Sequence, residues 1–257
     1  MSSSVEIAKV TVLITGSNRV VAAVRQTDDA TTQLLSELPR GSGSKLIIVK
    51  IDSLSDLDAQ NAVELLQTKH GIQKLDIVVA NAGYGTVYGD LSQVQAGELR
   101  DLFDVNAVGP LRLFQAVRPL LEAGNRSRFV LIGTPIASIS AMEKAPFPMI
   151  AYGASKAAAH YLTRKMHCES PRLTAFVVDP GFMQTDTGNT GARKFGLEQA
   201  PVPVDDSADF VFAQPCSLRR STWALALTLE PQIGKATREE TSGKFVTIDE
   251  SQEFLEW

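Results

Sequence analysis

Residues 76–83 read DIVVANAG, a short apolar run, Asp76–Ala80, that ends in a small polar turn. Five further runs of this kind occur along the chain: Lys9–Thr15 (KVTVLIT), Val20–Arg25 (VVAAVR), Leu46–Ile51 (LIIVKI), Phe129–Gly133 (FVLIG) and Ala175–Val178 (AFVV). None of them alternates strictly between apolar and polar residues, as a half-exposed strand does. Near-continuous apolar runs are typical of strands that helices cover on both faces. The six runs therefore predict a buried sheet.

Three stretches between these runs are predicted helices: Leu54–His70, Gln95–Ala123 and Ala151–Cys168, the second with a break at Gly109–Pro110. Alternation of strands and helices implies right-handed βαβ units. We therefore expect an α/β fold with a doubly wound parallel sheet. A single hydrophobic core still suffices for 257 residues, so we expect one domain over residues 1–257.

Two segments do not follow this pattern. Only four residues, Gly16–Arg19, separate the first two runs, whereas parallel neighbours need a crossover of a dozen or more residues. These two strands therefore cannot be parallel neighbours that are joined there. The segment 209–232 mixes strand-like and helix-like features without a clear period.

The composition excludes several classes of protein. With 44% hydrophobic and 21% charged residues, the chain resembles an ordinary globular domain. A net charge of −4 and the lack of a Lys/Arg block argue against a nucleic-acid partner. Two cysteines suggest a reducing compartment, and no apolar stretch reaches the ~18 residues of a membrane span. Without a visible signal peptide, we expect a cytoplasmic protein.

Small or polar residues follow almost every predicted strand. They are Gly16 and Arg19, Arg25, Asp52, Asn81 to Gly83, Thr134, and Pro180 with Gly181, in the order of the six strands. Ligands of open α/β sheets bind in the crevice at the carboxyl ends of the strands. Gly, Asn and Asp also end strands for local reasons, but glycine permits close approach to a phosphate-bearing ligand. Their coincidence at one edge favours a nucleotide crevice.

Tyr152 and Lys156 are four residues apart and share one face of a predicted helix. An ammonium beside a phenol lowers the phenol pKa, ordinarily ~10, so that the tyrosine could exchange a proton near neutral pH. Tyr161 and Lys165 repeat the spacing half a helical turn out of phase, so only one pair can face the crevice. Small neighbours favour the first pair, and we expect the second to face solvent.

The histidines are not expected to bind a metal. His160 and His167 share a helix face, but no Asp, Glu or Cys set completes a metal site around them. Surface or packing roles are the simpler interpretation.

These motifs, taken together and in this order, resemble the short-chain dehydrogenase/reductase family over residues 9–208 and 233–257. The motifs are Thr15-Gly16, the Asn81-Ala82-Gly83 turn, Asn106 in DVNAVGP, Tyr152 and Lys156 in AYGASKAA, and Pro180-Gly181 with Thr185 in DPGFMQTD. The stretches MEKAPFPMIAYGASKAA and KATREETSGKF are similar to the fungal norsolorinic-acid-ketoreductase-like branch. The resemblance implies a Rossmann fold, a nicotinamide cofactor, and hydride transfer between an alcohol and a ketone or aldehyde. On this branch the substrate would be an aromatic or polyketide-type compound of secondary metabolism.

The resemblance also implies roles for individual residues. Tyr152 would protonate the substrate oxygen, Lys156 would lower the Tyr152 pKa and bind the nicotinamide ribose, and Asn106 would hold a water of the proton relay. The hydroxyl that polarises the carbonyl would be Thr134, with Ser138 as the alternative. Asp52 would contact the adenine. The other residues expected at the cofactor are Gly16, Arg19, Arg25, Asn81, Ala82, Gly83, Pro180, Gly181, Met183 and Thr185.

Arg19 and Arg25 bear on the choice of cofactor. Their guanidinium groups suit a 2′-phosphate, and no acidic residue ends the second strand to bind a free 2′-hydroxyl, so NADP(H) is expected over NAD.

The chain also departs from the family. There, Thr-Gly continues into Gly-x-Gly and a helix whose N-terminus binds the pyrophosphate. Here Arg19 is followed directly by VVA, so the first βα unit looks truncated. We expect an NADP(H)-dependent oxidoreductase that acts on a small-molecule carbonyl or alcohol, and the family implies a homodimer or homotetramer. The alternative is a catalytically impaired relative that serves as a binding module.

Overall fold

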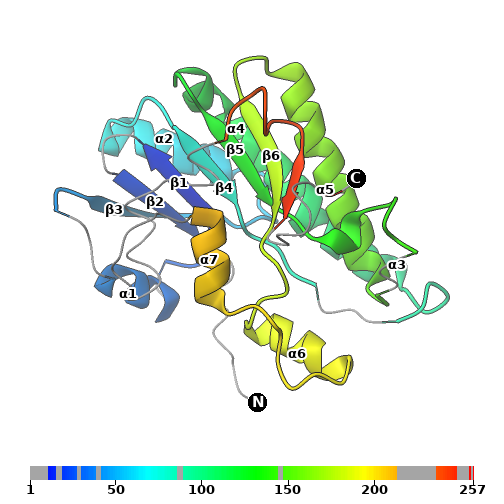
Figure 1. Ribbon diagram of the computed structural model, residues 1–257. Coiled ribbons are helices and arrows are strands. Elements are labelled where there is room, and N and C mark those ends of the chain that lie inside the picture. Colours follow the sequence, from blue (N-terminus) through cyan, green and yellow to red (C-terminus); the bar gives the residue numbers. More distant parts are fainter. Residues whose placement is uncertain are drawn as a thin grey trace.

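The computed structural model describes residues 11–15, 19–27, 30–38, 42–85, 89–143, 147–212 and 236–247, together with Leu255 and Trp257. Seven strands form one sheet in the order β3-β2-β1-β4-β5-β6-β7 (Figure 1). They are β1 (Thr11–Thr15), β2 (Arg19–Val24), β3 (Lys45–Lys50), β4 (Ile77–Ala80), β5 (Arg128–Ile132), β6 (Thr174–Asp179) and β7 (Phe245–Thr247). The six apolar runs thus predict the first six strands to within two residues. The sequence analysis missed β7, which has only three residues.

The helices are α1 (Ala30–Glu37), α2 (Asp58–His70), α3 (Ala96–Phe103), α4 (Gly109–Glu122), α5 (Ile150–Glu169), α6 (Asp186–Lys194) and α7 (Val204–Phe212). Those predicted from the sequence are α2, α5 and the stretch from α3 to α4. The helix does not have the expected break at Gly109–Pro110. Its winding changes just before, in the π-helical turn Asp104–Val108, which joins α3 to α4 without interrupting the helix. Pro110 has no backbone N–H and therefore donates no hydrogen bond to the preceding π-helical turn.

The direction of β1 corrects the expectation of a wholly parallel sheet. The pairs β2–β3, β4–β5, β5–β6 and β6–β7 are parallel, but β1 runs antiparallel to both of its neighbours, β2 and β4. The short connection between β1 and β2 permits a hairpin but no crossover. In this orientation β1 still forms hydrogen bonds with the backbone groups of β2 and β4 that would otherwise lack strand partners.

Because β1 is reversed, its carboxyl end lies at the edge of the sheet opposite to the carboxyl ends of the other strands. Ile14 pairs with Ile77 at the start of β4, so Thr15 lies away from the carboxyl end of β4, where Asn81 follows. Gly16 lies outside the described residues. Arg19 begins β2 beside Lys45 at the start of β3, and its side chain donates to the carbonyl oxygen of His70 at 2.8 Å.

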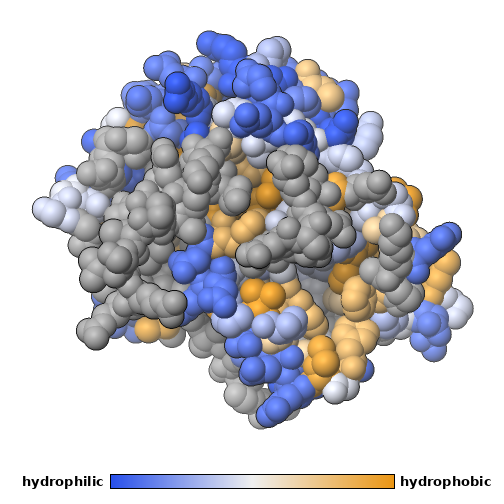
Figure 2. Space-filling model, in the orientation of Figure 1, coloured by the Kyte–Doolittle hydropathy of each residue, from blue (hydrophilic) through white to orange (hydrophobic). Residues whose placement is uncertain are grey.

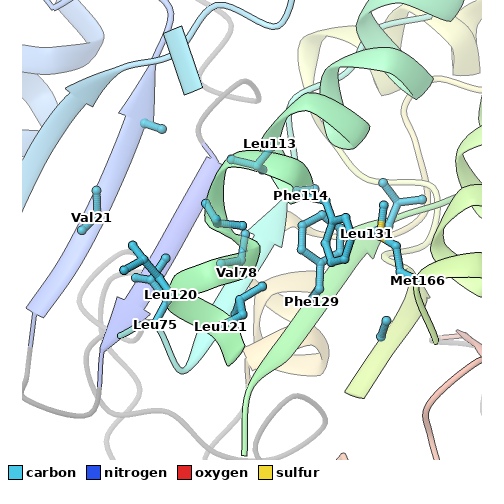
Figure 3. Close-up of a cluster of buried hydrophobic side chains, with 14 of the residues drawn as sticks. Val21, Leu75, Val78, Leu113, Phe114, Leu120, Leu121, Phe129, Leu131 and Met166 are labelled. Carbon is cyan, nitrogen blue, oxygen red and sulfur yellow. The ribbon is translucent and has the colours of Figure 1, made fainter. Parts of the chain in front are cut away.

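Helices cover both faces of the sheet. On one face α2, α4 and α5 pack against side chains of β2 to β7 in the main core, and on the other α1 and α7 cover two smaller clusters (Figure 1). In the main core Phe114 of α4 meets Phe129 of β5 edge to face, with ring centroids 5.4 Å apart (Figure 3). Because Phe129 is fully buried, truncation to alanine would cost about 3–5 kcal/mol.

Two further predictions concern the segment 209–232 and the lack of a membrane span. In the irregular segment 209–232, residues up to Phe212 belong to α7 and the rest lies outside the described residues. Within the described part of the chain, no helix combines the length and apolar character needed to cross a bilayer.

Candidate active site

Tyr152 and Lys156 lie in the first two turns of α5, beside the carboxyl end of β5. The Lys156 side chain is buried, and its Nζ donates to the carbonyl oxygen of Ile132 at 2.9 Å. The same Nζ lies 5.9 Å from the centre of the Tyr152 ring. Burial lowers the pKa of Lys156 to about 8. The first Tyr–Lys pair is therefore inside the protein at the predicted edge of the sheet.

The second pair is on the outer side of the same helix. Tyr161 is 66% exposed, and Lys165 forms an ion pair with Glu169 at 3.1 Å, one turn further along α5. The prediction that only the first pair faces the crevice is confirmed.

Asn106 occupies the π-helical turn and is fully buried. Its Oδ1 accepts from the backbone N–H of Tyr84 at 2.9 Å, and its Nδ2 donates to Tyr84 O at 2.8 Å and Ser155 Oγ at 3.0 Å. π-Helical turns often occur at functional sites, and this one aims the carboxamide at the loop after β4. Asn106 therefore ties that loop to α5, a contact that sequence spacing did not predict.

The two candidate hydroxyls have different surroundings. Thr134 lines the cavity of the site, and its Oγ1 accepts a long hydrogen bond of 3.4 Å from Ile136 N. Ser138 is buried, is not among the cavity-lining residues, and has its Oγ 3.2 Å from both Ser140 Oγ and Ala141 N. The geometry favours Thr134 as the hydroxyl that could reach a ligand.

A cavity of about 350 Å³ lies in front of Tyr152 and Lys156. Its walls come from the loops after β4, β5 and β6, the start of α5, and α6. Apolar side chains gather around the hollow above α6 in Figure 2. Of the residues predicted from the sequence, it is lined by Asn81, Gly83, Thr134, Tyr152, Lys156, Pro180, Gly181, Met183 and Thr185. The sequence did not indicate Tyr84, Ile136, Phe147, Phe182 and Phe195, because no spacing rule singles out side chains in the segments between the main strands and helices.

The loop after β4 approaches Lys156 closely. A Cβ atom on Gly83 would lie 2.9 Å from Asn106 Oδ1 and 3.2 Å from Lys156 Nζ, so a larger residue there would press on the ammonium group. An ammonium has three N–H donors, and the bond to Ile132 uses one of them. Lys156 thus has capacity left for the hydroxyls of a ribose, and the residues present fit the nicotinamide end of the cofactor.

Other predicted cofactor residues lie outside the cavity wall but at the same edge of the sheet. Arg25 is exposed directly after β2. Asp52 follows β3 by two residues, and its Oδ1 accepts from Leu54 N at 3.0 Å. Ala82 is half-buried between Asn81 and Gly83.

The phosphate end of the cofactor fits less well. Because β1 is reversed, its carboxyl end lies at the opposite edge, together with Arg19 at the start of its antiparallel neighbour β2. The structure therefore separates Arg19 from Arg25, which were expected to act together. Only three residues separate the described strands β1 and β2 in the sequence, which is too short for the helix whose N-terminus would face the pyrophosphate in this family.

His160 lies one turn beyond Lys156 in α5 and has an apolar environment. It is 3% exposed, neither ring nitrogen has a hydrogen-bond partner among the described residues, and its ring packs edge to face on Phe245 and Trp257. Burial, and then the charge of Lys156, lower the pKa of His160 to about 3. The described residues hold no cluster of three or more His, Cys, Asp or Glu that would bind a metal.

The fold and the cavity define an α/β protein with a ligand crevice that contains a Tyr–Lys pair. Residues 6–194 match the short chain dehydrogenase family, and the chain belongs to this family. It is 40% identical over 241 residues to a norsolorinic acid ketoreductase of Dothistroma septosporum, covering 93% of this chain and 82% of that protein. To the norsolorinic acid ketoreductase of Aspergillus parasiticus it is 42% identical, with 88% and 78% covered. The predicted family and branch are thereby confirmed.

Solved structures support the same architecture. The carbonyl reductase Sniffer of D. melanogaster superimposes with a TM-score of 0.70 at 21% identity, covering 92% of this chain and 87% of that one. The NADPH-bound carbonyl reductase from chicken fatty liver gives 0.71 at 18% identity, with the same coverage. At these identities the likeness concerns the fold, and it confirms the Rossmann-type α/β sheet.

Proposed function

We propose that this oxidoreductase uses NADP(H) to reduce a ketone or aldehyde to an alcohol, on an aromatic or polyketide-type substrate of secondary metabolism. The observation that carries the proposal is the position of Tyr152, which lines one cavity with Lys156 and Thr134. The names of the two fungal relatives support the reaction, and the NADPH-bound carbonyl reductase supports the cofactor.

The proton in this reaction comes from Tyr152. When bound, the cofactor supplies the hydride that the carbonyl carbon receives. The carbonyl oxygen then gains a proton from the Tyr152 hydroxyl, and the protonated Lys156 stabilises the phenolate left behind. Burial strengthens this electrostatic interaction, since little water screens the charge inside the site.

Two other residues prepare the substrate and the site. The Thr134 hydroxyl donates to the substrate oxygen and so polarises the carbonyl group. Asn106 holds the loop after β4 through Tyr84 and, through Ser155, the turn of α5 that carries Tyr152. Lys156 and the backbone at Gly83 bind the nicotinamide ribose, and Arg25 binds the 2′-phosphate.

The reversed β1 affects affinity for the cofactor more than the chemistry. Each charge-assisted hydrogen bond missing at the pyrophosphate would cost roughly 1.5–3 kcal/mol. Two such bonds correspond to roughly two to four orders of magnitude in affinity. We therefore expect weak NADPH binding, and activity that saturates only at high NADPH concentrations.

The direct experiment measures loss of NADPH absorbance with acetonaphthone as substrate, at NADPH concentrations up to millimolar. The proposal expects one alcohol formed for each NADPH consumed, with NADH a poorer donor. A folded protein that binds neither cofactor nor ketone would contradict it and favour a catalytically impaired relative that serves as a binding module.

A further inference from the structure

Two phenylalanines form an aromatic pair at the rim of the cavity. Phe147 precedes α5, Phe195 follows α6, and their ring centroids are 5.4 Å apart with an angle of 70° between the ring planes. Both line the cavity, yet they remain 43% and 37% exposed. They therefore keep apolar surface open to a ligand that enters the cavity.

Backbone hydrogen bonds fix the main chain at both residues. The backbone N–H of Met149 donates to Phe147 O at 2.8 Å, and Met149 also bridges to Gly89. Phe195 N donates to the carbonyl oxygens of Gly191 and Ala192 in the last turn of α6, at 3.2 and 3.0 Å. Phe147 is thus tied to the start of the helix that carries Tyr152, and the pair bridges this helix to α6.

We infer that Phe147 and Phe195 form an aromatic clamp that selects substrates with a planar ring system next to the reacting carbonyl. Aromatic rings attract one another through offset-stacked and edge-to-face contacts, in addition to the gain from burying apolar area. A fused aromatic substrate would contact one ring by its face and the other by its edge. An aliphatic ligand of similar size would gain only the apolar burial.

The remaining walls agree with this substrate class. Ile136, Phe182 and Met183 add apolar surface to the wall, whereas Thr134, Tyr152 and Lys156 add polar groups, as do Asp179, Thr185 and Thr187. A largely apolar ligand whose carbonyl oxygen reaches Tyr152 and Thr134 matches this mixed lining. The inference rests on the proposed function for the orientation of the carbonyl but not for the selection of the ring.

Calorimetric titration of the full chain without cofactor tests the clamp, with naphthol and its saturated analogue decahydronaphthol as the two ligands. The wild type should bind naphthol at least tenfold more tightly than decahydronaphthol. The double variant Phe147→Leu/Phe195→Leu keeps apolar bulk but removes both rings, so it should lose roughly tenfold in naphthol affinity and less than threefold in decahydronaphthol affinity.

Matched variants separate the clamp from general effects. Phe147→Tyr/Phe195→Tyr keeps the rings and should retain naphthol binding. Leu197→Ala changes an exposed apolar residue near α6 that does not line the cavity, and it should bind both ligands as the wild type does. Equal loss for both ligands, or unchanged naphthol affinity in the Leu variant, would overturn the clamp. Because no turnover is measured, a chain that selects naphthol but reduces no ketone would refute the proposed function and leave the clamp standing.

Discussion

Lys156 Nζ donates to the carbonyl oxygen of Ile132 at 2.9 Å, which joins α5 to the end of the interior strand β5. This bond holds a positive charge in the interior, where burial lowers the pKa of Lys156 to about 8. The charge is present below that pH and is lost as the pH rises through it. The pKa thus links the packing of α5 to the pH range in which the site works.

The first prediction concerns this pH range. Carbonyl reduction, measured as kcat/KM of the free enzyme, should fall about tenfold per pH unit above a pH of about 8, because neutral Lys156 no longer stabilises the phenolate. Lys156→Arg keeps its charge throughout and should move this alkaline limb to higher pH, even at reduced activity. A profile that is identical in both proteins would contradict the assignment.

Thr134 and Ser138 can be distinguished by a pair of substitutions. Thr134→Val should lower kcat/KM by roughly ten- to a hundredfold, because the substrate oxygen loses a hydrogen-bond donor, whereas Thr134→Ser should stay near the wild type. Ser138→Ala should lower the melting temperature, since buried Ser138 accepts from Ala141 N, but leave kcat/KM within a few-fold. The reverse result in steady-state kinetics would assign the role to Ser138.

Arg25 and Arg19 provide a matched test of cofactor choice. Arg25→Gln should weaken NADPH binding at least tenfold and leave NADH binding unchanged, because only the 2′-phosphate is affected. Arg19→Gln should change neither affinity, since this residue is at the opposite edge of the sheet, where it donates to His70 O. Fluorescence titration gives both constants, and equal effects of the two substitutions would contradict the placement of the 2′-phosphate.

His160 should make the fold sensitive to acid. Its pKa is about 3 in the folded chain and ordinarily 6.5, so the unfolded chain gains a proton as the pH falls through 6.5 and the folded chain does not. The free energy of unfolding should therefore fall by about 1.4 kcal/mol for each pH unit below 6.5, until the pH approaches 3. Denaturant unfolding between these values measures the slope.

The control for this prediction is another histidine. His160→Leu should flatten the slope, while His70→Gln, at an exposed position, should leave it unchanged. A residual slope will remain in His160→Leu, because burial and the nearby Arg238 also lower the pKa of His167. Identical slopes in wild type and His160→Leu would show that His160 is protonated in the folded chain.

Much of this architecture can be predicted from the sequence, since buried strands carry uninterrupted apolar runs. The four residues of Gly16–Arg19 already exclude a parallel crossover, yet they do not say which strand reverses. That depends on partners far away in sequence, because β1 completes hydrogen bonds for both β2 and β4. Pairing across the sheet is a tertiary property that local spacing does not encode.

The site divides in the same way. Tyr152 and Lys156 are found from their spacing, because one helix carries both and its period sets their common face. The aromatic clamp cannot be found from spacing, since Phe147 and Phe195 come from separate loops and meet only after α5 and α6 are in place. The contact of Asn106 with Tyr84 likewise depends on a π-helical turn that residue propensities do not indicate.

The most direct test of the central claim compares the two Tyr–Lys pairs of α5. Tyr152→Phe and Tyr161→Phe remove the same hydroxyl from one helix, one inside the cavity and one in solvent. With acetonaphthone and saturating NADPH, Tyr152→Phe should lose at least a hundredfold in kcat, since it lacks the proton donor, and Tyr161→Phe should stay within threefold of the wild type. If Tyr152→Phe retains wild-type turnover, or if only Tyr161→Phe loses it, Tyr152 is not the proton donor of this enzyme.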